Sequence, residues 1–218
     1  MKNSLLLVSF LLFTLGGFAQ ELKMSPFYYQ RASLFEELPI GHKDIVFLGN
    51  SITNGCEWSE LFKNPLIKNR GISGDVTMGV YNRLDPIVKG KPAKIFLLIG
   101  VNDISWGMSA DSIAGNIAMI VEKIKSKSPS TKIYLQSVLP FDDDKGYYKK
   151  LIGRFPVAAQ INEQLVQLAE KENLTFINLY PHFVDKNTGK LDAKYSNDGL
   201  HLLGNGYLLW RDLIKKYL

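Results

Sequence analysis

Cysteine is nearly absent from this chain of 218 residues, which has only Cys56. A single cysteine excludes a disulfide within the chain, so the fold depends on its hydrophobic core for stability. Cys56 follows Ser51 by five residues, and no sequence motif pairs it with a histidine. We therefore interpret Cys56 as a small, partly buried residue and not as a reactive thiol.

Metal-binding residues are also scarce. The chain has 3 histidines beside its one cysteine, and these residues form no cluster with the spacing of metal ligands. The run Asp142-Asp143-Asp144 concentrates carboxylates, but consecutive side chains point in different directions. This run favours an exposed turn over a metal site. No metal and no organic cofactor are expected.

A long apolar run occurs only near the start of the chain, over residues 5–15, and it is too short to span a bilayer as a helix. Lys2 precedes the run and Gly17-Phe18-Ala19 follows it, which is typical of a signal peptide. We predict a signal peptide at residues 1–19 and export to the periplasm or the extracellular space. An uncleaved anchor is the alternative, but the short run argues against a stable membrane anchor. Residues 20–218 suit one domain.

Charge shows little patterning. The formal net charge is +5, and the lysines are scattered along the chain. No basic stripe alternates with aromatic residues, so binding to nucleic acid is not expected. A solvated basic surface is the preferred interpretation. Attraction to acidic polysaccharides or anionic membranes remains open.

Short apolar runs alternate with helical patterns along the rest of the chain. The runs are apolar on both alternations, as in parallel strands that are buried on both faces. Stripes of apolar residues at helical spacing lie between and after them. This alternation predicts a doubly wound α/β fold. The predicted strands are 45–49, 67–71, 95–100, 133–139 and 175–179, and the helical stripes cover 80–88, 113–124, 157–168 and 207–217.

Polar segments follow the predicted strands where each strand ends. Residues 49–53 follow the first strand, residues 71–75 the second and residues 100–103 the third, and residues 198–201 precede the last helix. Reactive groups in open α/β sheets lie at the carboxyl ends of the strands, so we expect these segments to meet. They contain a serine, a carboxylate and an imidazole, which are the nucleophile, orienter and base of a serine hydrolase.

Each segment also has a structural interpretation. Ser51 can cap a helix, Asn102 and Asp103 can form a turn, and His201 can be a surface histidine. The presence of all four segments in this order favours an active site. His42 lies in no motif, and His182 follows the fifth strand in a segment that we interpret as a loop.

The segments Gly49-Asn50-Ser51, Gly71 to Asp75, Gly100-Val101-Asn102-Asp103 and Asp198 to His201 resemble the four blocks of the GDSL, or SGNH, hydrolase family. The resemblance extends over residues 45–207. It implies a flavodoxin-like three-layer sandwich with a five-stranded parallel sheet.

The resemblance also implies roles for individual residues. Ser51 is the expected nucleophile, with Asp198 and His201 as its partners. The backbone N–H groups of Ser51 and Gly74 and the side-chain amide of Asn102 are the expected oxyanion donors. The family name GDSL spells a motif in which aspartate precedes the serine, whereas in this chain Asn50 precedes Ser51. An amide keeps hydrogen bonds in the turn but removes a negative charge beside the nucleophile.

Two tryptophans follow the nucleophile and oxyanion segments. Trp58 and Trp106 are candidates for a sugar-stacking wall, and burial in the core is the equal alternative.

The expected function is a secreted serine esterase that removes short acyl groups, above all acetyl, from carbohydrate. A lysophospholipase or a lipid esterase like platelet-activating-factor acetylhydrolase is the alternative. A carbohydrate-binding protein without activity is the alternative from another class. The expected partner is a small-molecule or glycan ester, and the sequence leaves the oligomeric state open.

Overall fold

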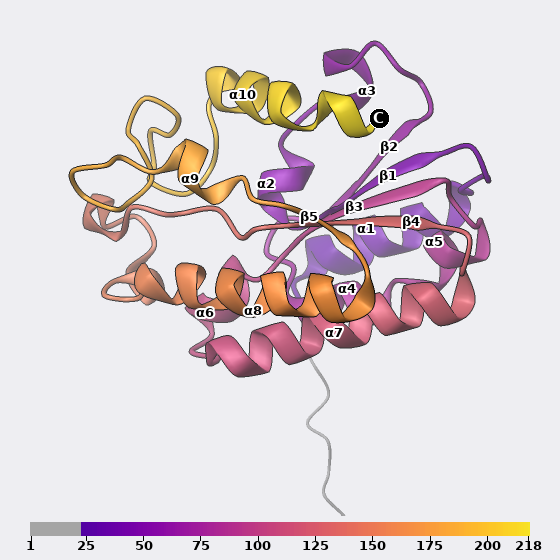
Figure 1. Ribbon diagram of the computed structural model, residues 1–218, viewed down its shortest axis with the longest axis horizontal. Coiled ribbons are helices and arrows are strands. Elements are labelled where there is room, and N and C mark those ends of the chain that lie inside the picture. Colours follow the sequence, from indigo (N-terminus) through magenta and orange to yellow (C-terminus); the bar gives the residue numbers. More distant parts are fainter. Residues whose placement is uncertain (1–22) are drawn as a thin grey trace, which may run out of the picture.

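A computed structural model describes residues 23–218, so the predicted signal peptide lies outside the described residues. Its centre is a five-stranded sheet in the order β2-β1-β3-β4-β5, and every pair of neighbouring strands is parallel (Figure 1). This order is that of flavodoxin-like sheets, and it confirms the predicted fold class. The strands are β1 (Ile45–Gly49), β2 (Ile67–Gly71), β3 (Lys94–Leu98), β4 (Lys132–Gln136) and β5 (Thr175–Ile177).

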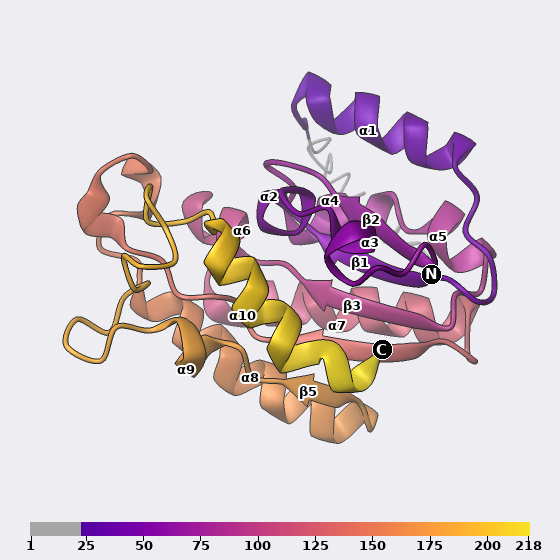
Figure 2. The ribbon, with the colours of Figure 1, turned by 90° about the horizontal axis from the view of Figure 1, so that it is seen from above.

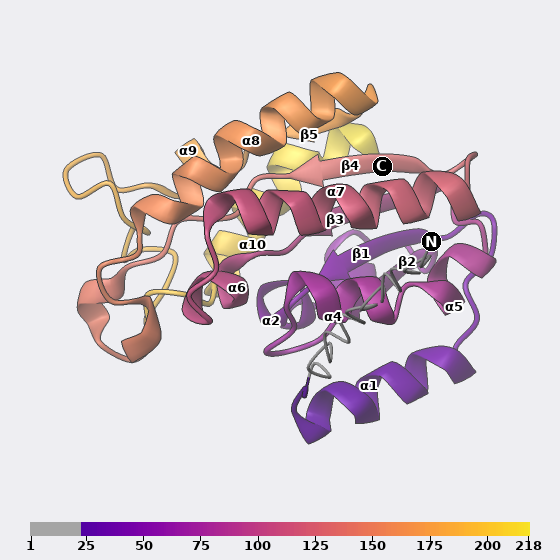
Figure 3. The same ribbon diagram turned by 90° about the horizontal axis from the view of Figure 1, so that it is seen from below.

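Helices cover both faces of the sheet and form the outer layers of a sandwich. One face carries α2 (Ser51–Asn54), α3 (Trp58–Leu61) and α10 (Gly204–Ile214), as Figure 2 shows. The other face, seen in Figure 3, carries α4 (Thr77–Asn82), α5 (Asp85–Lys89), α7 (Ala110–Lys127) and α8 (Pro156–Glu172). The remaining elements are α1 (Pro26–Glu37), α6 (Val101–Ser105), α9 (Tyr180–Phe183) and the 3₁₀ helices η1 (Asp143–Lys145), η2 (Lys149–Leu151) and η3 (Lys215–Tyr217).

The strands are buried because the sheet lies between these helical layers. All five residues of β1 are buried, and so are four of the five residues of both β3 and β4. This burial explains why the runs are apolar on both alternations. No helix among residues 23–218 is long and apolar enough to cross a membrane.

The predicted strand boundaries agree for β1 and β2 but extend too far for the other three strands. Residues 99–100 and 137–139 lie beyond the ends of β3 and β4, and most of them remain buried. Apolar composition therefore continues where the strand has already ended. The stripe over residues 80–88 forms α4 and α5, with the break at residues 83–84. Pro86 lies in the first turn of α5, where its missing N–H would have no partner in the helix.

The segment before β1 forms α1, which lies beside β2 and α4 (Figures 2 and 3). The side chain of Ser25 caps the helix by accepting a hydrogen bond from the backbone N–H of Tyr28. Tyr28 and Phe35 are buried, and the Tyr28 hydroxyl donates a 2.8 Å hydrogen bond to the carbonyl of Gly79. The segment therefore packs against the rest of the described chain.

Candidate active site

The turn after β1 fixes the position of Ser51 at the start of α2. The Asn50 side chain accepts a 3.0 Å hydrogen bond from the N–H of Ile52 and so caps this short helix. Gly49 allows close packing, because a Cβ there would lie 2.3 Å from the carbonyl oxygen of Leu98. The asparagine that departs from the family name thus retains a capping role without carrying a charge.

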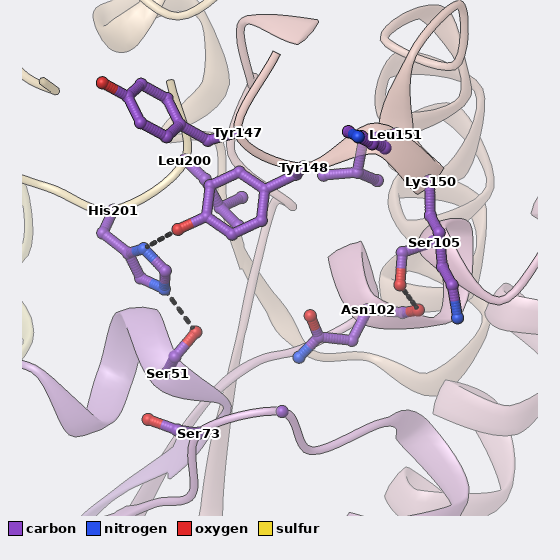
Figure 4. Close-up of a pocket in the computed structure, with 12 residues that line it drawn as sticks. Ser51, Ser73, Asn102, Ser105, Tyr147, Tyr148, Lys150, Leu151, Leu200 and His201 are labelled. Atoms are coloured by element: carbon purple, nitrogen blue, oxygen red, sulfur yellow. Dashed lines mark hydrogen bonds between the residues drawn. The ribbon is translucent and has the colours of Figure 1, made fainter. Parts of the chain in front are cut away.

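Ser51, His201 and Asp198 form a continuous chain of hydrogen bonds. Nε2 of His201 lies 2.9 Å from Oγ of Ser51, and Nδ1 lies 2.7 Å from Oδ2 of Asp198. Figure 4 shows the His201 ring directed at the Ser51 hydroxyl. The structure thus brings together three side chains that are up to 150 residues apart in the sequence. In this order they can move a proton from the serine to the imidazole.

Asp198 is held as a carboxylate by several donors. Its Oδ1 atom accepts hydrogen bonds from the backbone N–H groups of Leu200 and His201, at 2.9 and 2.8 Å. Burial acts to raise the pKa of Asp198, but hydrogen bonds from His201, Tyr148 and these two N–H groups outweigh it and hold the pKa well below its usual range. An ionised Asp198 can therefore orient His201 at neutral pH.

Gly74 and Asn102 lie on the same pocket as Ser51. Gly74 has φ +80°, a conformation that glycine adopts without strain, and no atom lies within 4 Å of the position of a Cβ. The Nδ2 atom of Asn102 donates a 2.8 Å hydrogen bond to the carbonyl of Asp75, which leaves its second N–H for a ligand. Figure 4 shows this nitrogen on the side of the pocket where Ser51 lies.

A buried ion pair joins β1 to the Gly74 loop. Nε of Arg83 donates to Oδ2 of Asp75 at 2.8 Å, and Nη2 of Arg83 donates to the carbonyl of Gly49 at 3.0 Å. Burial raises the pKa of Asp75 to about 6, although Arg83 acts to lower it. Because Asp75 follows Gly74 and Gly49 lies close before Ser51, Arg83 fixes the spacing of the two segments.

A second buried carboxylate connects the Asn102 segment to α4. Asp103 accepts hydrogen bonds from the backbone N–H and the hydroxyl of Thr77, the latter at 2.5 Å. Burial raises the pKa of Asp103 to about 6, and the bonds from Thr77 oppose the shift. Both acidic residues that follow the oxyanion segments thus serve the packing of the site.

The pocket above Ser51 has a volume of about 570 Å³ and opens to the surface. One wall comes from residues 147–151, between η1 and α8, which no motif indicated. The lining residues are Ser51, Ser73, Gly74, Asn102, Ser105, Tyr147, Tyr148, Lys149, Lys150, Leu151, Leu200 and His201.

Tyr148 is the most direct contact that sequence reasoning missed. Its hydroxyl donates to Oδ2 of Asp198 at 2.7 Å, and its oxygen lies 2.9 Å from Nδ1 of His201. Tyr148 lies in no motif, and its position depends on how the loop folds back. The N–H of Asp142 donates a 2.7 Å hydrogen bond to the carbonyl of Gly199, which ties the loop to the segment that holds Asp198.

The two tryptophans do not line the pocket. Trp58 is 1% exposed, stacks on Phe47 at 4.3 Å between ring centroids, and donates its indole N–H to the carbonyl of Thr53. Its predicted contact with substrate is therefore wrong, because α3 directs the ring into the core. Trp106 is 47% exposed at the end of α6 but is not among the lining residues. The aromatic wall of the pocket comes from Tyr147 and Tyr148 instead.

The remaining polar candidates lie away from the hydrogen-bonded chain at Ser51. His42 and His182 are exposed, and Cys56 is buried, with its pKa raised to about 12 by burial and by Glu57. A thiol with so high a pKa is a poor nucleophile.

The acidic run before Tyr147 is bound to a lysine. Lys190 forms ion pairs with Asp143 and with Asp144, at 2.5 and 2.7 Å, and the N–H of Gly153 donates to Asp143 at 2.6 Å. Asp142 caps η1 by accepting from the N–H of Asp144. Only Asp144 of the three is exposed. The run is therefore a structural anchor, and it is more buried than the predicted exposed turn.

Known proteins share this fold and sequence pattern. Human platelet-activating factor acetylhydrolase IB subunit alpha2 is 29% identical over 171 residues, which are 75% of this chain and 71% of that protein. The crystal structure of a GDSL-like lipase from Bacteroides thetaiotaomicron is 27% identical, with a TM-score of 0.73 over 87% of this chain and 96% of that chain.

A more distant structure shares the fold alone. It is a mutant of an acetyl-xylooligosaccharide esterase from Geobacillus stearmophilus, 17% identical, with a TM-score of 0.64 over 81% of this chain and 94% of that chain. Residues 47–209 match the model of the GDSL-like lipase/acylhydrolase family, which is most of the chain and contains all four segments of the site. The chain therefore belongs to the GDSL-like lipase/acylhydrolase family, and it is an ester hydrolase.

Proposed function

We propose that the protein is an exported serine esterase that removes acetyl groups from carbohydrate through a Ser51–His201–Asp198 triad. The observation that carries the proposal is the chain of hydrogen bonds from Ser51 through His201 to Asp198 beside Gly74 and Asn102.

Acylation begins at the Ser51 hydroxyl. Nε2 of His201 accepts the proton as Oγ attacks the ester carbonyl, and Asp198 stabilises the imidazolium that forms. The N–H groups of Ser51 and Gly74 and the free N–H of Asn102 donate to the oxyanion. Loss of one such donor typically raises the barrier by about 3 kcal/mol.

Collapse of this intermediate breaks the bond between the acyl carbon and the leaving oxygen. His201 gives its proton to that oxygen, and the alcohol departs from an acyl-enzyme on Ser51. Water then attacks the acyl-enzyme, again with His201 as base, and releases the carboxylic acid and free Ser51.

Short acyl groups suit the packing behind Ser51. Ile52 and Val101, which adjoin Ser51 and Asn102 in the sequence, are 1 and 2% exposed and do not line the pocket, so they leave no cavity there for a longer acyl chain. The names of the curated relative and of the more distant esterase both refer to acetyl groups. These observations support acetyl as the transferred group.

The outer part of the pocket supports a sugar as the leaving alcohol. Tyr147 is 71% exposed at the rim and offers a ring on which a sugar can stack. The hydroxyls of Ser73 and Ser105 lie on the same pocket. These two hydroxyls and the Tyr147 ring can contact a hydroxyl-rich substrate.

An acetylated lipid is the second candidate substrate, and the curated relatives named for platelet-activating factor favour it. The third interpretation of the sequence, a carbohydrate-binding protein without activity, does not agree with membership of a hydrolase family. The intact arrangement of Ser51, His201 and Asp198 also argues against it, because binding alone requires no activated hydroxyl.

The nucleophile is tested by Ser51→Ala with 4-nitrophenyl acetate as substrate. The variant should lose activity by about ten-thousandfold or more while its circular-dichroism spectrum stays unchanged. Ser73→Ala is the matched control, since Ser73 lines the same pocket without a histidine partner and should retain most activity. A folded Ser51→Ala variant with near-normal turnover contradicts the proposal.

The leaving group and the export are tested separately. Acetylated xylo-oligosaccharide should be a better substrate than an acetylated glycerophospholipid in detergent micelles, and the opposite order moves the lipid candidate to first place.

The full chain, expressed in bacterial cells that secrete it, should begin at Gln20 when its amino terminus is sequenced. Retention of Met1 contradicts cleavage by signal peptidase.

A further inference from the structure

The mouth of the pocket carries positive charge without a compensating carboxylate. Lys149 and Lys150 both line it, and no aspartate or glutamate is among the lining residues. Figure 4 shows the Lys150 side chain on the side of the pocket where Asn102 and Ser105 lie.

The two lysines are exposed and make no ion pair or hydrogen bond through their side chains within residues 23–218. Lysines elsewhere in the described chain do find partners, such as Lys125 with Glu172 at 2.7 Å and Lys194 with Asp192 at 2.8 Å. The charge at the mouth is therefore available to a ligand.

The backbone that carries the lysines is fixed on both sides. Tyr148, directly before them, is hydrogen-bonded to Asp198, and Leu151, directly after them, is 3% exposed. Lys149 and Lys150 are the first two residues of η2, which ends at Leu151. The backbone of Lys149 and Lys150 is therefore held beside the pocket.

Carboxylates of the same loop and of the active site are already bound by other groups. Asp143 and Asp144 are paired with Lys190, and Asp198 is occupied by His201 and Tyr148. Two carboxylates of the loop are therefore bound to a lysine outside the pocket, whereas Lys149 and Lys150 line it. An unpaired cluster of one sign at the mouth of a cleft attracts ligands of the opposite sign.

We infer that the preferred substrate is an acetyl ester whose alcohol part carries a negative charge, which Lys149 and Lys150 recognise. This inference rests on the proposed esterase function and narrows its substrate class. Within the proposed carbohydrate specificity, the anionic group is the carboxylate of a uronic acid in an acetylated polysaccharide. A phosphate on an acetylated lipid offers the same charge and is separated from the carboxylate by the test.

The test compares two substrates that differ only at their carboxyl groups, which are charged in one and neutral in the other. One is an acetylated oligogalacturonide, and the other is the same compound with its carboxyl groups methyl-esterified. The wild type should show a higher kcat/KM on the charged form, by about fivefold, which corresponds to about 1 kcal/mol for exposed ion pairs. This preference should fall as ionic strength rises.

The variant Lys149→Gln/Lys150→Gln should bring the ratio of the two kcat/KM values close to one, mainly through KM on the charged substrate. Lys171→Gln removes an exposed lysine near the end of α8 and should leave the ratio unchanged. A wild-type ratio near one, or a ratio that the double substitution does not alter, overturns the inference.

Other outcomes are distinguishable. If the wild type does not hydrolyse 4-nitrophenyl acetate, the proposed esterase function itself is wrong. If an acetylated anionic glycerophospholipid in detergent micelles is preferred to both sugars and the preference depends on the two lysines, the charge recognition is supported and the carbohydrate assignment is overturned.

Discussion

The hydroxyl of Tyr148 donates a 2.7 Å hydrogen bond to Oδ2 of Asp198, the oxygen that also accepts from Nδ1 of His201. The tyrosine oxygen lies 2.9 Å from that same nitrogen, so the three polar groups form a closed triangle. Burial, together with Asp198, raises the pKa of Tyr148 above its usual value, which keeps the hydroxyl protonated and able to donate. Tyr148 is therefore a positioning residue for the Asp198–His201 pair.

The variant Tyr148→Phe should lower kcat/KM about tenfold or more, because a hydrogen bond to a charged group is worth roughly 1.5–3 kcal/mol. Without this hydrogen bond, the Asp198 carboxylate interacts more strongly with the protonated imidazole of His201, so the imidazole of the variant keeps its proton to a higher pH than that of the wild type. The acidic limb of the kcat/KM profile should consequently move to higher pH. A merely structural role for Tyr148 would lower activity without moving this limb. Tyr147→Phe, which also removes a phenol hydroxyl, should leave the limb in place.

His201→Ala should be nearly as damaging as Ser51→Ala, and the double variant should be hardly worse than either. The 2.9 Å contact between Nε2 and Oγ makes the two side chains one unit, since neither can perform the attack alone. Asp198→Ala should cost less, because a neutral imidazole can still accept a proton. The measurement is kcat for 4-nitrophenyl acetate, and losses that multiply in the double variant argue against joint action.

Arg83→Met should destabilise the protein by about 3–5 kcal/mol, because it leaves the Asp75 carboxylate buried without its partner. The double variant Asp75→Asn/Arg83→Met should be less destabilised than the sum of the single effects, since it leaves no buried charge. Urea unfolding gives the free energies for this cycle. Additive effects would show that the 2.8 Å pair contributes no coupling.

Asp103 should make stability depend on pH between about 4 and 6. Burial raises its pKa in the folded state to about 6, above the unfolded value of roughly 3.9. The folded state therefore binds the proton more tightly, so this stabilising contribution is present below pH 4 and is lost as pH rises through 6. The difference in unfolding free energy between wild type and Asp103→Asn should change by about 1–3 kcal/mol over this range. A constant difference contradicts the assignment.

Local sequence signals predicted the sheet because burial on both faces leaves a continuous apolar run. They also predicted that the segments with Ser51, Gly74, Asn102 and His201 meet. Three of these segments directly follow predicted strands, and the fourth precedes the last helix. The role of Tyr148 could not be predicted, since it depends on contacts between residues 50 positions apart. The burial of Trp58 could not be predicted either, because the orientation of the four-residue helix α3 decides whether its ring faces the pocket or the core.

The final prediction concerns acyl length. Ile52, next to Ser51 in the sequence, and Val101 are at most 2% exposed, and Leu200 lines the pocket with His201. Well-packed side chains of this kind do not move aside without strain.

An acetyl group should therefore fit next to Ser51, whereas each further methylene that stays in water forfeits about 0.8 kcal/mol of burial. We expect kcat/KM on 4-nitrophenyl esters to fall from acetate to butyrate and to be very low for octanoate. Ser51→Ala provides the background rate for each ester, which separates enzymatic from spontaneous hydrolysis. A rate that rises toward octanoate would mean that the outer pocket, with Tyr147 and Leu151, houses a long chain. The lipid candidate would then replace the short-acyl proposal.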